Sequence, residues 1–229
     1  MPNKKDIQQL FDKIAPTYDK LNHIMSFGTD RGWRRKAVRE ITNGQGALQI
    51  LDVATGTGDF AIAIARKAHP DSQIVGIDLS EKMLEVGRQK VGENIQLEQG
   101  DVEALAFADE SFDRVSVAFG IRNFEHLEKG LAEMCRVLKP GGKLVILELS
   151  YPDNKLLLWA YKLYTLRILP FIGKLISGEG TAYHYLPDSI LHFPKPNTIL
   201  PMLKEVGFQT AAVRKMTFGV CLMYIAEKK

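Results

Sequence analysis

The sequence predicts a Rossmann-like α/β fold, with a mostly parallel sheet that ends in one antiparallel edge. Two observations support this prediction. Between residues 49 and 149, short apolar runs alternate with segments of helical length, which implies right-handed crossovers between parallel strands. Near the C-terminus, two further strand-like runs are separated only by the turn at Phe218-Gly219, so we expect them to pair as an antiparallel hairpin.

An N-terminal helical cap is expected over residues 1–45. Apolar residues recur at helical spacing over 4–14, and Pro16 then discourages continuation of that helix. Residues 33–41 predict a second short helix, which Asn43-Gly44 ends.

The core of the domain is expected over residues 46–150. Five apolar runs predict its strands, and three segments between them predict helices. Pro140-Gly141-Gly142 closes the last of these helices. The strands are expected at 49–54, 74–77, 95–99, 112–119 and 143–149, and the helices at 60–68, 81–90 and 127–138.

Residues 151–198 interrupt this alternation, and we interpret them as a helical insertion that forms a substrate lid. The alternation resumes over 199–229, with a helix at 202–206 and strands at 210–215 and 221–226. All these segments are assigned to one domain, because 229 residues with 45% hydrophobic content suit a single globular core with additions.

Charge and cysteine content argue against several classes of protein. A formal net charge of +3 is too small to indicate a nucleic-acid partner. Cys135 and Cys221 have no CxxC partner, and no histidine has metal-ligand spacing, so neither a disulfide framework nor a metal site is expected. The sequence shows no secretory signal and no apolar stretch of about 20 residues, so we expect a cytoplasmic protein without a membrane span.

The ends of the first three strands carry residues that predict a nucleoside site. The first strand leads into Thr55-Gly56-Thr57-Gly58, whose glycines allow the backbone to approach a ligand closely. The second strand ends in Asp78-Leu79, and an acid at that place can accept both hydroxyls of a ribose. Asp101-Val102 follows the third strand, where the acid can accept the adenine amino group and the valine can pack on the ring. Taken alone, Gly100-Asp101 is equally typical of a turn.

Two cofactors with such a nucleoside were compared, NAD and S-adenosylmethionine. Gly56-x-Gly58-x-x-Ala61 fits the dinucleotide pattern, but that pattern offers a bare helix N-terminus to a pyrophosphate. Here Asp52 precedes the loop and Asp59 stands at the helix N-terminus. Two carboxylates repel a pyrophosphate and attract an ammonium and a sulfonium, which favours S-adenosylmethionine. In the structural interpretation, Asp59 is a helix N-cap and Asp52 bonds the loop backbone.

Three longer motifs are more specific than the glycine loop. They are Tyr18-Asp19-Lys20-Leu21-Asn22-His23-Ile24-Met25-Ser26 with Trp33 downstream, Phe119-Gly120-Ile121-Arg122-Asn123, and Arg136-Val137-Leu138-Lys139-Pro140-Gly141-Gly142-Lys143-Leu144 running to Glu148 and Ser150. Together they resemble the signatures of the ubiquinone/menaquinone biosynthesis C-methyltransferases. The likeness extends from about Phe11 to the C-terminus.

The resemblance implies a class I S-adenosylmethionine-dependent methyltransferase with a seven-stranded sheet. It implies methylation of a ring carbon in a polyprenylated naphthoquinol or benzoquinol, and we favour the naphthoquinol of menaquinone biosynthesis. Asp30 stands where the family signature usually has histidine, and Ala118 stands where some members have serine. Carried over by position, the family's cofactor contacts fall on Thr57, Asp78, Asp101 and Val102. With the neighbouring loop residues, the predicted cofactor-binding set is Asp52, Thr55, Gly56, Thr57, Gly58, Asp78, Leu79, Asp101, Val102 and Ala118.

Catalysis is expected to involve Arg122, Asn123 and Tyr18. The attacking ring carbon must lie ortho to a phenol oxygen that is losing its proton, so the reduced quinol is the expected substrate. Arg122 could stabilise the phenolate, Asn123 could hold the water that takes the proton, and Tyr18 could close over the site. The structural alternatives are that Arg122 pairs with an acid, Asn123 caps the next helix and Tyr18 packs in the core.

The insertion begins with an apolar, aromatic and basic stretch from Lys155 to Lys174. Lys155 and Lys162 are expected to share a helical face, and Pro170 to end or kink the helix. The stretch is interpreted either as a core helix of a lid or as an apolar wall for the prenyl tail. In the second interpretation it also contacts anionic lipids at the inner face of the membrane. We favour a combined role, and the prediction also allows for a homodimer.

Three other functions remain as alternatives at this point. The first is a class I methyltransferase for another small molecule, such as a sterol or phenol, which should lack the N-terminal signature. The second is an NAD-dependent oxidoreductase, which Asp52 and Asp59 disfavour. The third is a non-catalytic module in a quinone-biosynthesis complex, which the intact glycine loop, Asp78 and Asp101 disfavour.

Overall fold

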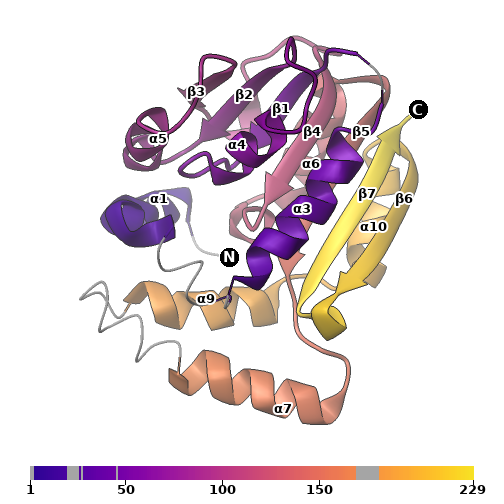
Figure 1. The fold of residues 1–229 in the computed structure, drawn as a ribbon. Helices are drawn as coiled ribbons and strands as arrows, with labels where there is room; N and C mark the ends of the chain where they lie inside the picture. Colours follow the sequence, from indigo (N-terminus) through magenta and orange to yellow (C-terminus); the bar gives the residue numbers. More distant parts are fainter. Residues whose placement is uncertain (1–2, 20–25, 27, 45, 169–180) are drawn as a thin grey trace.

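The computed structural model describes residues 3–19, 26, 28–44, 46–168 and 181–229. Their strands form one seven-stranded sheet with the order β3-β2-β1-β4-β5-β7-β6 (Figure 1). The strands are β1 (Gln49–Val53), β2 (Gln73–Asp78), β3 (Ile95–Gln99), β4 (Phe112–Ala118), β5 (Leu138–Leu149), β6 (Phe208–Met216) and β7 (Cys221–Lys228).

Strand directions confirm the predicted fold class. The pairs from β3 across to β5 are all parallel. β7 lies antiparallel between β5 and β6, and the turn η5 (Thr217–Gly219) joins β6 to β7 where the hairpin is expected. The antiparallel part of the sheet is therefore confined to one edge.

Helices cover both faces of the sheet. One face packs against α3 (Thr29–Ile41), α4 (Asp59–Ala65) and α5 (Glu81–Arg88), and the other against α6 (Leu127–Val137) and α10 (Pro196–Glu205). Each face thus has its own apolar core. Trp33 and Ile64 belong to the first core, and Leu131 and Leu203 belong to the second.

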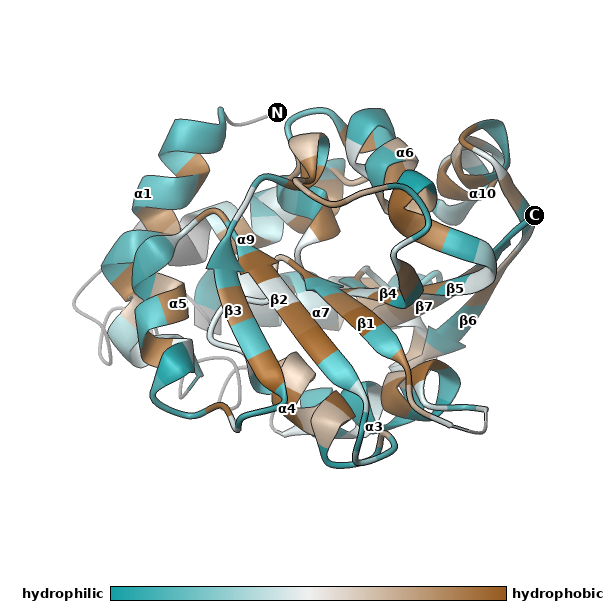
Figure 2. Cartoon of the chain, turned by 90° about the horizontal axis from the view of Figure 1, so that it is seen from above, coloured by the Kyte–Doolittle hydropathy of each residue, from teal (hydrophilic) through white to brown (hydrophobic). Residues whose placement is uncertain are grey.

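Successive side chains of β1 alternate between these two cores. Leu51 and Val53 belong to the core beneath α6 and α10, whereas Ile50 belongs to the core beneath α3 and α4. In Figure 2, where hydrophobic residues are brown, β1 and β2 are largely brown. Because side chains alternate along a strand, Asp52 points to the α3–α4 face. This orientation decides what Asp52 can contact.

The largest differences from the predicted boundaries are at the starts of β5, α3 and α10. β5 begins at Leu138 rather than at residue 143, because Pro140-Gly141-Gly142 forms an irregularity within the strand instead of a break. Gly141 has φ +72°, a left-handed conformation that glycine adopts at little cost. α3 begins at Thr29 and α10 at Pro196, earlier than the predicted starts at 33 and 202. Proline suits the first turn of a helix, since the missing N–H would have no partner there.

Two segments cover the end of the sheet where the parallel strands finish (Figure 1). The N-terminal cover consists of α1 (Lys4–Ile14) and η1 (Ala15–Thr17), and the insertion contributes α7 (Lys155–Leu163), η4 (Tyr164–Ile168) and α9 (Thr181–His192). Pro170 and the signature residues 20–25 lie outside the described residues. In the part of the chain that is described, no helix combines the length and the apolar character that crossing a membrane requires.

Candidate active site

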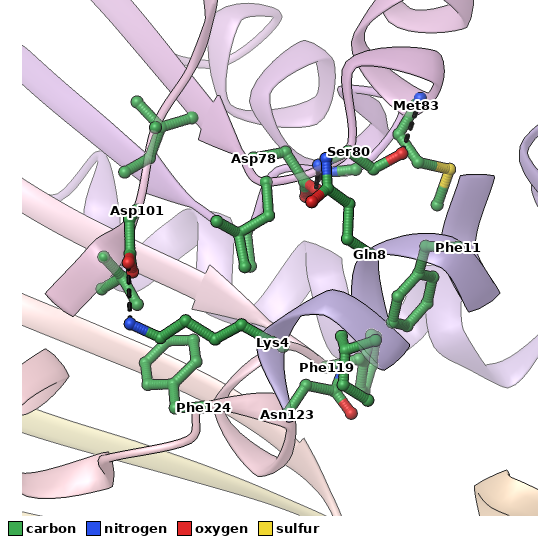
Figure 3. Close-up of a pocket in the computed structure, with 18 of the residues that line it drawn as sticks. Lys4, Gln8, Phe11, Asp78, Ser80, Met83, Asp101, Phe119, Asn123 and Phe124 are labelled. Carbon is green, nitrogen blue, oxygen red and sulfur yellow. Dashed lines mark hydrogen bonds and ion pairs between the residues drawn. The ribbon is translucent and has the colours of Figure 1, made fainter. Parts of the chain in front are cut away.

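A pocket lies where β1, β2, β3 and β4 end, and we call it the strand-end pocket (Figure 3). The topology brings the loops after these strands to one edge of the sheet, as expected for parallel neighbours. Predicted residues that line the pocket are Tyr18, Gly56, Asp78, Leu79, Asp101, Val102, Ala118 and Asn123. Predicted residues that lie outside this lining are Asp52, Thr55, Thr57, Gly58 and Arg122.

Asp78 is the central acid of the pocket. One carboxylate oxygen accepts the Gly56 N–H at 2.8 Å and the other accepts the Ser80 N–H at 2.9 Å. Burial raises the pKa of Asp78, and the backbone N–H groups of Ser80, Gly56 and Leu79 act in the opposite direction. The carboxylate therefore ties the glycine loop after β1 to the loop after β2.

The loops after β1 and β4 approach each other closely. Ala54 and Phe119, which follow these strands, have φ of +50° and +61°, a region that costs non-glycine residues on the order of 1–3 kcal/mol. At Gly120, an added Cβ would lie 2.6 Å from the Cβ of Ala54, so only glycine permits this approach. Gly56 has φ +59°, which glycine tolerates. Of the five non-glycine residues with positive φ in the described part of the chain, Ala54 and Phe119 thus line the pocket.

Asp52 lies beneath the glycine loop instead of facing the pocket. Its carboxylate is 1% exposed and accepts the hydroxyls of Thr55 at 2.6 Å and Ser116 at 2.6 Å. Burial raises the pKa of Asp52 to about 6, whereas the hydrogen bonds from Ser116 and Thr55 lower it. Asp52 and Thr55 thus support the loop from within the fold, and their direct contact with a cofactor stays a prediction.

Thr57 and Gly58 shape the loop without lining the pocket. The Thr57 hydroxyl donates to Asp19 of the N-terminal segment at 2.5 Å. Gly58 is the N-cap of α4 with φ +78°, and its N–H donates to the Thr55 carbonyl at 3.0 Å. At the same helix terminus, Asp59 forms an ion pair with Lys90 at 2.8 Å. Both carboxylates therefore have other partners, and the argument that Asp52 and Asp59 jointly attract a cation stays a prediction.

Asp101 and Val102 lie at the opposite end of the pocket, where η2 (Val102–Ala104) begins. One oxygen of Asp101 caps η2 by accepting the Glu103 N–H at 2.9 Å. The other oxygen accepts the Lys4 ammonium at 2.7 Å, and Lys4 also pairs with Glu103 at 2.8 Å. Figure 3 shows the Lys4 side chain extending to Asp101. Lys4 is a pocket residue that no sequence pattern indicates, because its partner lies 97 positions away.

The N-terminal cover supplies one wall of the pocket. Ile7, Gln8 and Phe11 of α1 line it together with Tyr18. The Tyr18 ring packs edge-on against Phe11, with ring centroids 5.9 Å apart. Tyr18 is half-buried and belongs to neither apolar core, so of the two positions considered for it the structure favours the one at the site.

Arg122 belongs to η3 (Ile121–Asn123) and pairs with a buried acid. One terminal nitrogen lies 2.7 Å from Glu148, and the two side chains are only 6% and 1% exposed. Glu148 also accepts the Arg122 backbone N–H at 3.1 Å, and Arg122 donates to the Phe119 carbonyl. Burial alone would lower the pKa of Arg122, but the Glu148 carboxylate raises it, so the guanidinium stays charged. Glu148 stands alone among apolar residues of β5, a signal that could have marked it as a paired acid.

Asn123 connects the pocket to the insertion. Its side-chain oxygen accepts the Tyr185 hydroxyl of α9 at 2.7 Å. The predicted role of Asn123 as a helix cap is not seen, since α6 has His126 at its N-cap position without a side-chain cap bond. Tyr185 is a second residue that sequence reasoning missed, because 62 positions separate it from its partner.

The pocket fits a nucleoside. Acceptors stand at Asp78 and Asp101 for the hydroxyl and amino donors of a nucleoside, and Leu79 and Val102 provide apolar contact between them. The departures from the family signature lie nearby: Ala118 lines the pocket, and Asp30 is buried and accepts the Ser26 hydroxyl at 2.7 Å. A pocket so composed can bind an adenosyl group, and η3 stands beside it with an arginine and an amide.

Comparisons with known proteins point in one direction. A model of the ubiE/COQ5 methyltransferase family matches residues 1–228. The chain is 47% identical over 229 residues to a Bacteroides fragilis protein named demethylmenaquinone methyltransferase, covering 98% of this chain and 93% of that one. It is 49% identical over 227 residues to a Geobacter sulfurreducens protein named ubiquinone/menaquinone biosynthesis C-methyltransferase UbiE, covering 97% and 88%.

A solved structure shows a similar fold. It is a methyltransferase of Thermotoga maritima described as dependent on S-adenosylmethionine, with a TM-score of 0.68 and 18% identity, covering 97% of this chain and 99% of that one. At this level of identity the similarity concerns the fold alone.

Proposed function

The chain belongs to the ubiE/COQ5 methyltransferase family, and on that premise we propose that it methylates a ring carbon of a polyprenylated naphthoquinol in menaquinone biosynthesis. The family membership confirms the predicted resemblance. The choice of a naphthoquinol over a benzoquinol follows relatives such as the Bacteroides fragilis protein, whose name specifies demethylmenaquinone.

S-adenosylmethionine is the cofactor, and when bound it supplies a methyl group on a sulfonium as the electrophile. Asp78 and Asp101 would hold its ribose and adenine, because both are acceptors in the strand-end pocket. Leu79, Val102 and Ala118 would pack against it, and Gly56 leaves room for it beside Tyr18. Asp52, Thr55, Thr57 and Gly58 would act indirectly, by fixing the conformation of the glycine loop.

The observation that carries the mechanism is the position of η3 at the end of β4. A quinol ring carbon becomes nucleophilic as the neighbouring phenol loses its proton, so the protein must stabilise negative charge on that oxygen. Arg122 is charged, nearly buried and held by Glu148 and the Phe119 carbonyl, so its guanidinium is fixed before the reaction begins. Fixed charge in a site that excludes water is the arrangement most effective at such stabilisation.

Asn123 and Tyr18 complete the proposed machinery. Asn123 lines the strand-end pocket, and its amide N–H₂ can orient the water that receives the phenol proton. Its oxygen is held by Tyr185, so the amide cannot turn freely. Tyr18 closes the pocket from the N-terminal side and excludes water from the reacting atoms.

A methyl-transfer assay tests the activity. The protein would receive S-adenosylmethionine with an isotopically labelled methyl group and reduced demethylmenaquinol, with a polyprenyl benzoquinol precursor in parallel. We expect label on a ring carbon of the naphthoquinol, located by mass spectrometry. Label on both rings would mean a dual role, and label on neither, despite cofactor binding, would overturn the proposal in favour of another small-molecule substrate.

Arg122→Lys tests the proposed catalytic group. The lysine keeps a positive charge beside Glu148. The variant Arg122→Ala would instead leave the Glu148 carboxylate buried and unpaired, which would destabilise the fold by about 3–5 kcal/mol. One ammonium cannot serve both Glu148 and a phenolate with the geometry of a guanidinium, so we expect turnover to fall about 100-fold. Cofactor affinity should stay within about threefold of wild type, since Arg122 lies outside the strand-end pocket. Turnover within a few-fold of wild type would exclude this role.

We further propose that α7 contacts the surface of the membrane that holds the substrate. α7 has no buried residue, and Leu156 and Trp159 on it are 73% and 63% exposed. Lys155 and Lys162 flank them on the same short helix. Exposed leucine and tryptophan beside lysines are typical of helices that lie in the interface of an anionic bilayer.

The cellular location and the oligomeric state of the protein are also proposed. Cys135 and Cys221 are both free and buried, and free thiols are usual in the reducing cytoplasm, so we propose a cytoplasmic protein at the inner face of the membrane. The allowed homodimer stays a prediction, which light scattering of the purified protein would measure.

A further inference from the structure

The exposed large apolar side chains in the described part of the chain gather at one end of the molecule. They lie on α7, α9 and η5, and they are Leu156, Leu157, Trp159, Leu163, Leu191 and Phe218. α7 and α9 belong to the insertion, which covers the end of the sheet where the parallel strands finish (Figure 1). Scattered apolar side chains are ordinary on a protein surface, whereas a group of them indicates an interaction surface.

η5 reaches the same end of the sheet as the insertion. Leu149, the last residue of β5, pairs with Cys221, which begins β7 two residues after η5. Figure 1 shows η5 at the end of the β6–β7 hairpin that lies toward α7. Phe218 on this turn is 81% exposed, more than Leu156 or Trp159 on α7. The turn therefore adds an aromatic side chain to the apolar surface of the insertion.

The backbone of η5 holds Phe218 outward in a strained conformation. Thr217, Phe218 and Gly219 have φ of +45°, +56° and +91°. Glycine adopts such angles at little cost, but other residues keep them only where the surroundings enforce them. Here the Thr217 hydroxyl accepts the Trp33 indole N–H at 2.8 Å, and Gly219 is buried against Pro152. The fold thus fixes both neighbours of Phe218 while its ring stays in solvent, where only a partner outside the fold could cover it.

Contacts tie η5 to the start of α7. The Ser150 N–H donates to the Val220 carbonyl at 2.8 Å, directly after η5. Lys215, two residues before η5, forms an ion pair with Asp153. α7 begins two residues after Asp153, with Asn154 as its N-cap. Phe218 and the exposed face of α7 are therefore held in a fixed relation to each other.

The charge of this surface suits an anionic partner. Residues 155–168 contain three basic residues and no acidic residue, and Lys155, Lys162 and Arg167 are all exposed. Separate leucine, tryptophan and phenylalanine side chains with basic residues among them are typical of surfaces that enter the interface of an anionic bilayer. An anionic lipid surface is therefore the partner that the chemistry favours.

We infer that Phe218 inserts into the bilayer as a second anchor beside α7, so that the end of the sheet with the strand-end pocket faces the membrane. The inference rests on the membrane contact proposed above for α7 and adds an orientation to it. A single helix in the interface leaves the protein free to roll about the helix axis. A second contact at η5 prevents this rolling and keeps the substrate side of the protein against the lipid.

Phe218→Gly tests the anchor. Glycine relieves the left-handed conformation, which offsets its greater freedom in the unfolded chain, so the melting temperature should stay within about 3 °C of wild type. Affinity for phosphatidylglycerol vesicles, measured by cosedimentation, should fall about tenfold because an aromatic side chain no longer enters the lipid. Phe218→Trp is the matched control, and it should bind these vesicles at least as tightly as wild type.

The outcomes separate this inference from the contact of α7. Equal vesicle affinity in Phe218→Gly and wild type would overturn the inference, while a loss in the Leu156→Gln and Trp159→Gln double variant would still support α7. A fall in the melting temperature of Phe218→Gly by about 10 °C or more would show that Phe218 stabilises the fold, and would also overturn it. Absence of wild-type binding to the vesicles would overturn both contacts, and methyl transfer to a detergent-solubilised quinol would be tested independently.

A fluorescent label tests the orientation. Cys135 and Cys221 are buried, so an environment-sensitive thiol dye would react selectively with the exposed cysteine of Phe218→Cys. The control is Glu93→Cys, an exposed position just before β3 and therefore at the opposite end of the sheet. On phosphatidylglycerol vesicles we expect the emission of the Phe218→Cys label to shift to shorter wavelength and that of the Glu93→Cys label to stay unchanged. Equal shifts at both positions, or none at Phe218→Cys, would contradict the proposed orientation.

Discussion

The two covers of the site close it by different means. The N-terminal cover is held by charged and polar contacts to each loop beneath it: Asp19 to Thr57 after β1, Asp12 to Ser80 after β2, and Lys4 to Asp101 after β3. The insertion contacts the site through the Tyr185–Asn123 hydrogen bond, while α7 turns apolar side chains to solvent.

The difference between the two covers matches the chemistry of the ligand proposed for each. The strand-end pocket is built for a polar, charged cofactor that arrives from water, and the N-terminal cover over it is rich in charge. The proposed quinol carries a polyprenyl chain and arrives from lipid, and the insertion beside it exposes leucine and tryptophan. Under the proposed function, each cover thus has the surface chemistry of the phase from which its ligand would come.

The largest expected effect is on the cofactor side, from Asp78→Asn. Both carboxylate oxygens of Asp78 accept backbone N–H groups, and the amide would place its own N–H₂ against one of them. We expect the dissociation constant of S-adenosylmethionine to rise about 100-fold, as for the loss of two bonds to a charged group. Calorimetry on the purified variant would measure it.

Asp52→Asn is the matched control for that variant. Asp52 is buried, whereas Asp78 is half-buried and lines the pocket, and the partners of Asp52 are the hydroxyls of Thr55 and Ser116, which can reverse their roles and accept from the amide. We therefore expect a loss of cofactor affinity below about tenfold. Equal losses of cofactor affinity in Asp52→Asn and Asp78→Asn would mean that both residues act by supporting the glycine loop, and that Asp78 does not contact the cofactor.

A smaller effect is expected on the lipid side, from the double variant Leu156→Gln with Trp159→Gln. Both residues are exposed, so the variant should be as stable as wild type. Its affinity for anionic vesicles should fall about tenfold, because it loses about 1.4 kcal/mol of free energy from burying apolar side chains in the bilayer interface. Cosedimentation with vesicles at low and high salt would measure it, and Lys4→Gln on the other cover should bind vesicles as wild type does. Absence of wild-type binding to anionic vesicles would refute the membrane contact.

The smallest effect is expected from Lys4→Gln. The Lys4–Asp101 pair is partly exposed, and such pairs contribute about 0–1 kcal/mol. Loss of the pair should loosen α1 and raise both the association and dissociation rates of S-adenosylmethionine by about two- to fivefold, with little change in affinity. Stopped-flow measurements would detect this, and unchanged rates would show that α1 does not limit access.

Low pH should weaken the ion pair of Lys4 with Glu103, as the substitution Lys4→Gln does. Burial by itself raises the pKa of Glu103, but hydrogen bonds from Lys4 and from the His126 N–H lower it below its usual value. The stabilisation by a depressed carboxyl is present above its unfolded pKa of about 4.3 and is lost as pH falls through the folded pKa. The difference in thermal stability between wild type and Lys4→Gln should therefore be present at pH 7 and shrink below about pH 4. A difference that stays constant with pH would contradict this.

The sequence predicts the cofactor side better than the substrate side. Asp78, Asp101 and the glycine loop follow strands at fixed places, and parallel strands bring such places together whatever lies between them. The position of Asp52 outside the pocket lining depends on side-chain direction, since alternation along β1 turns it to the α3–α4 face. The element boundaries that failed, at Leu138 and Pro196, involve glycine and proline, which the fold accommodates within a strand and at a helix start.

The partners missed on both sides have no local signature. Lys4 and Tyr185 meet residues far away in the chain, and only the packing of α1 and α9 on the sheet brings them there. Glu148 was quoted within a motif but not assigned a partner, and its pairing with Arg122 depends on how η3 follows β4. Contacts set by the docking of whole helices cannot be obtained from spacing along one sequence.

The hydrogen bond between Tyr185 and Asn123 has a thermodynamic consequence for the two ligands. A molecule that orders α9 also restrains η3, and η3 forms part of the wall where the other molecule binds. Coupling of this kind is reciprocal, so the factor by which the first ligand tightens the second equals the factor by which the second tightens the first. An inhibitor seated under α9 would therefore gain affinity from a saturating supply of methyl donor, and would be measured as a mixed inhibitor whose effect is strongest at high donor concentration.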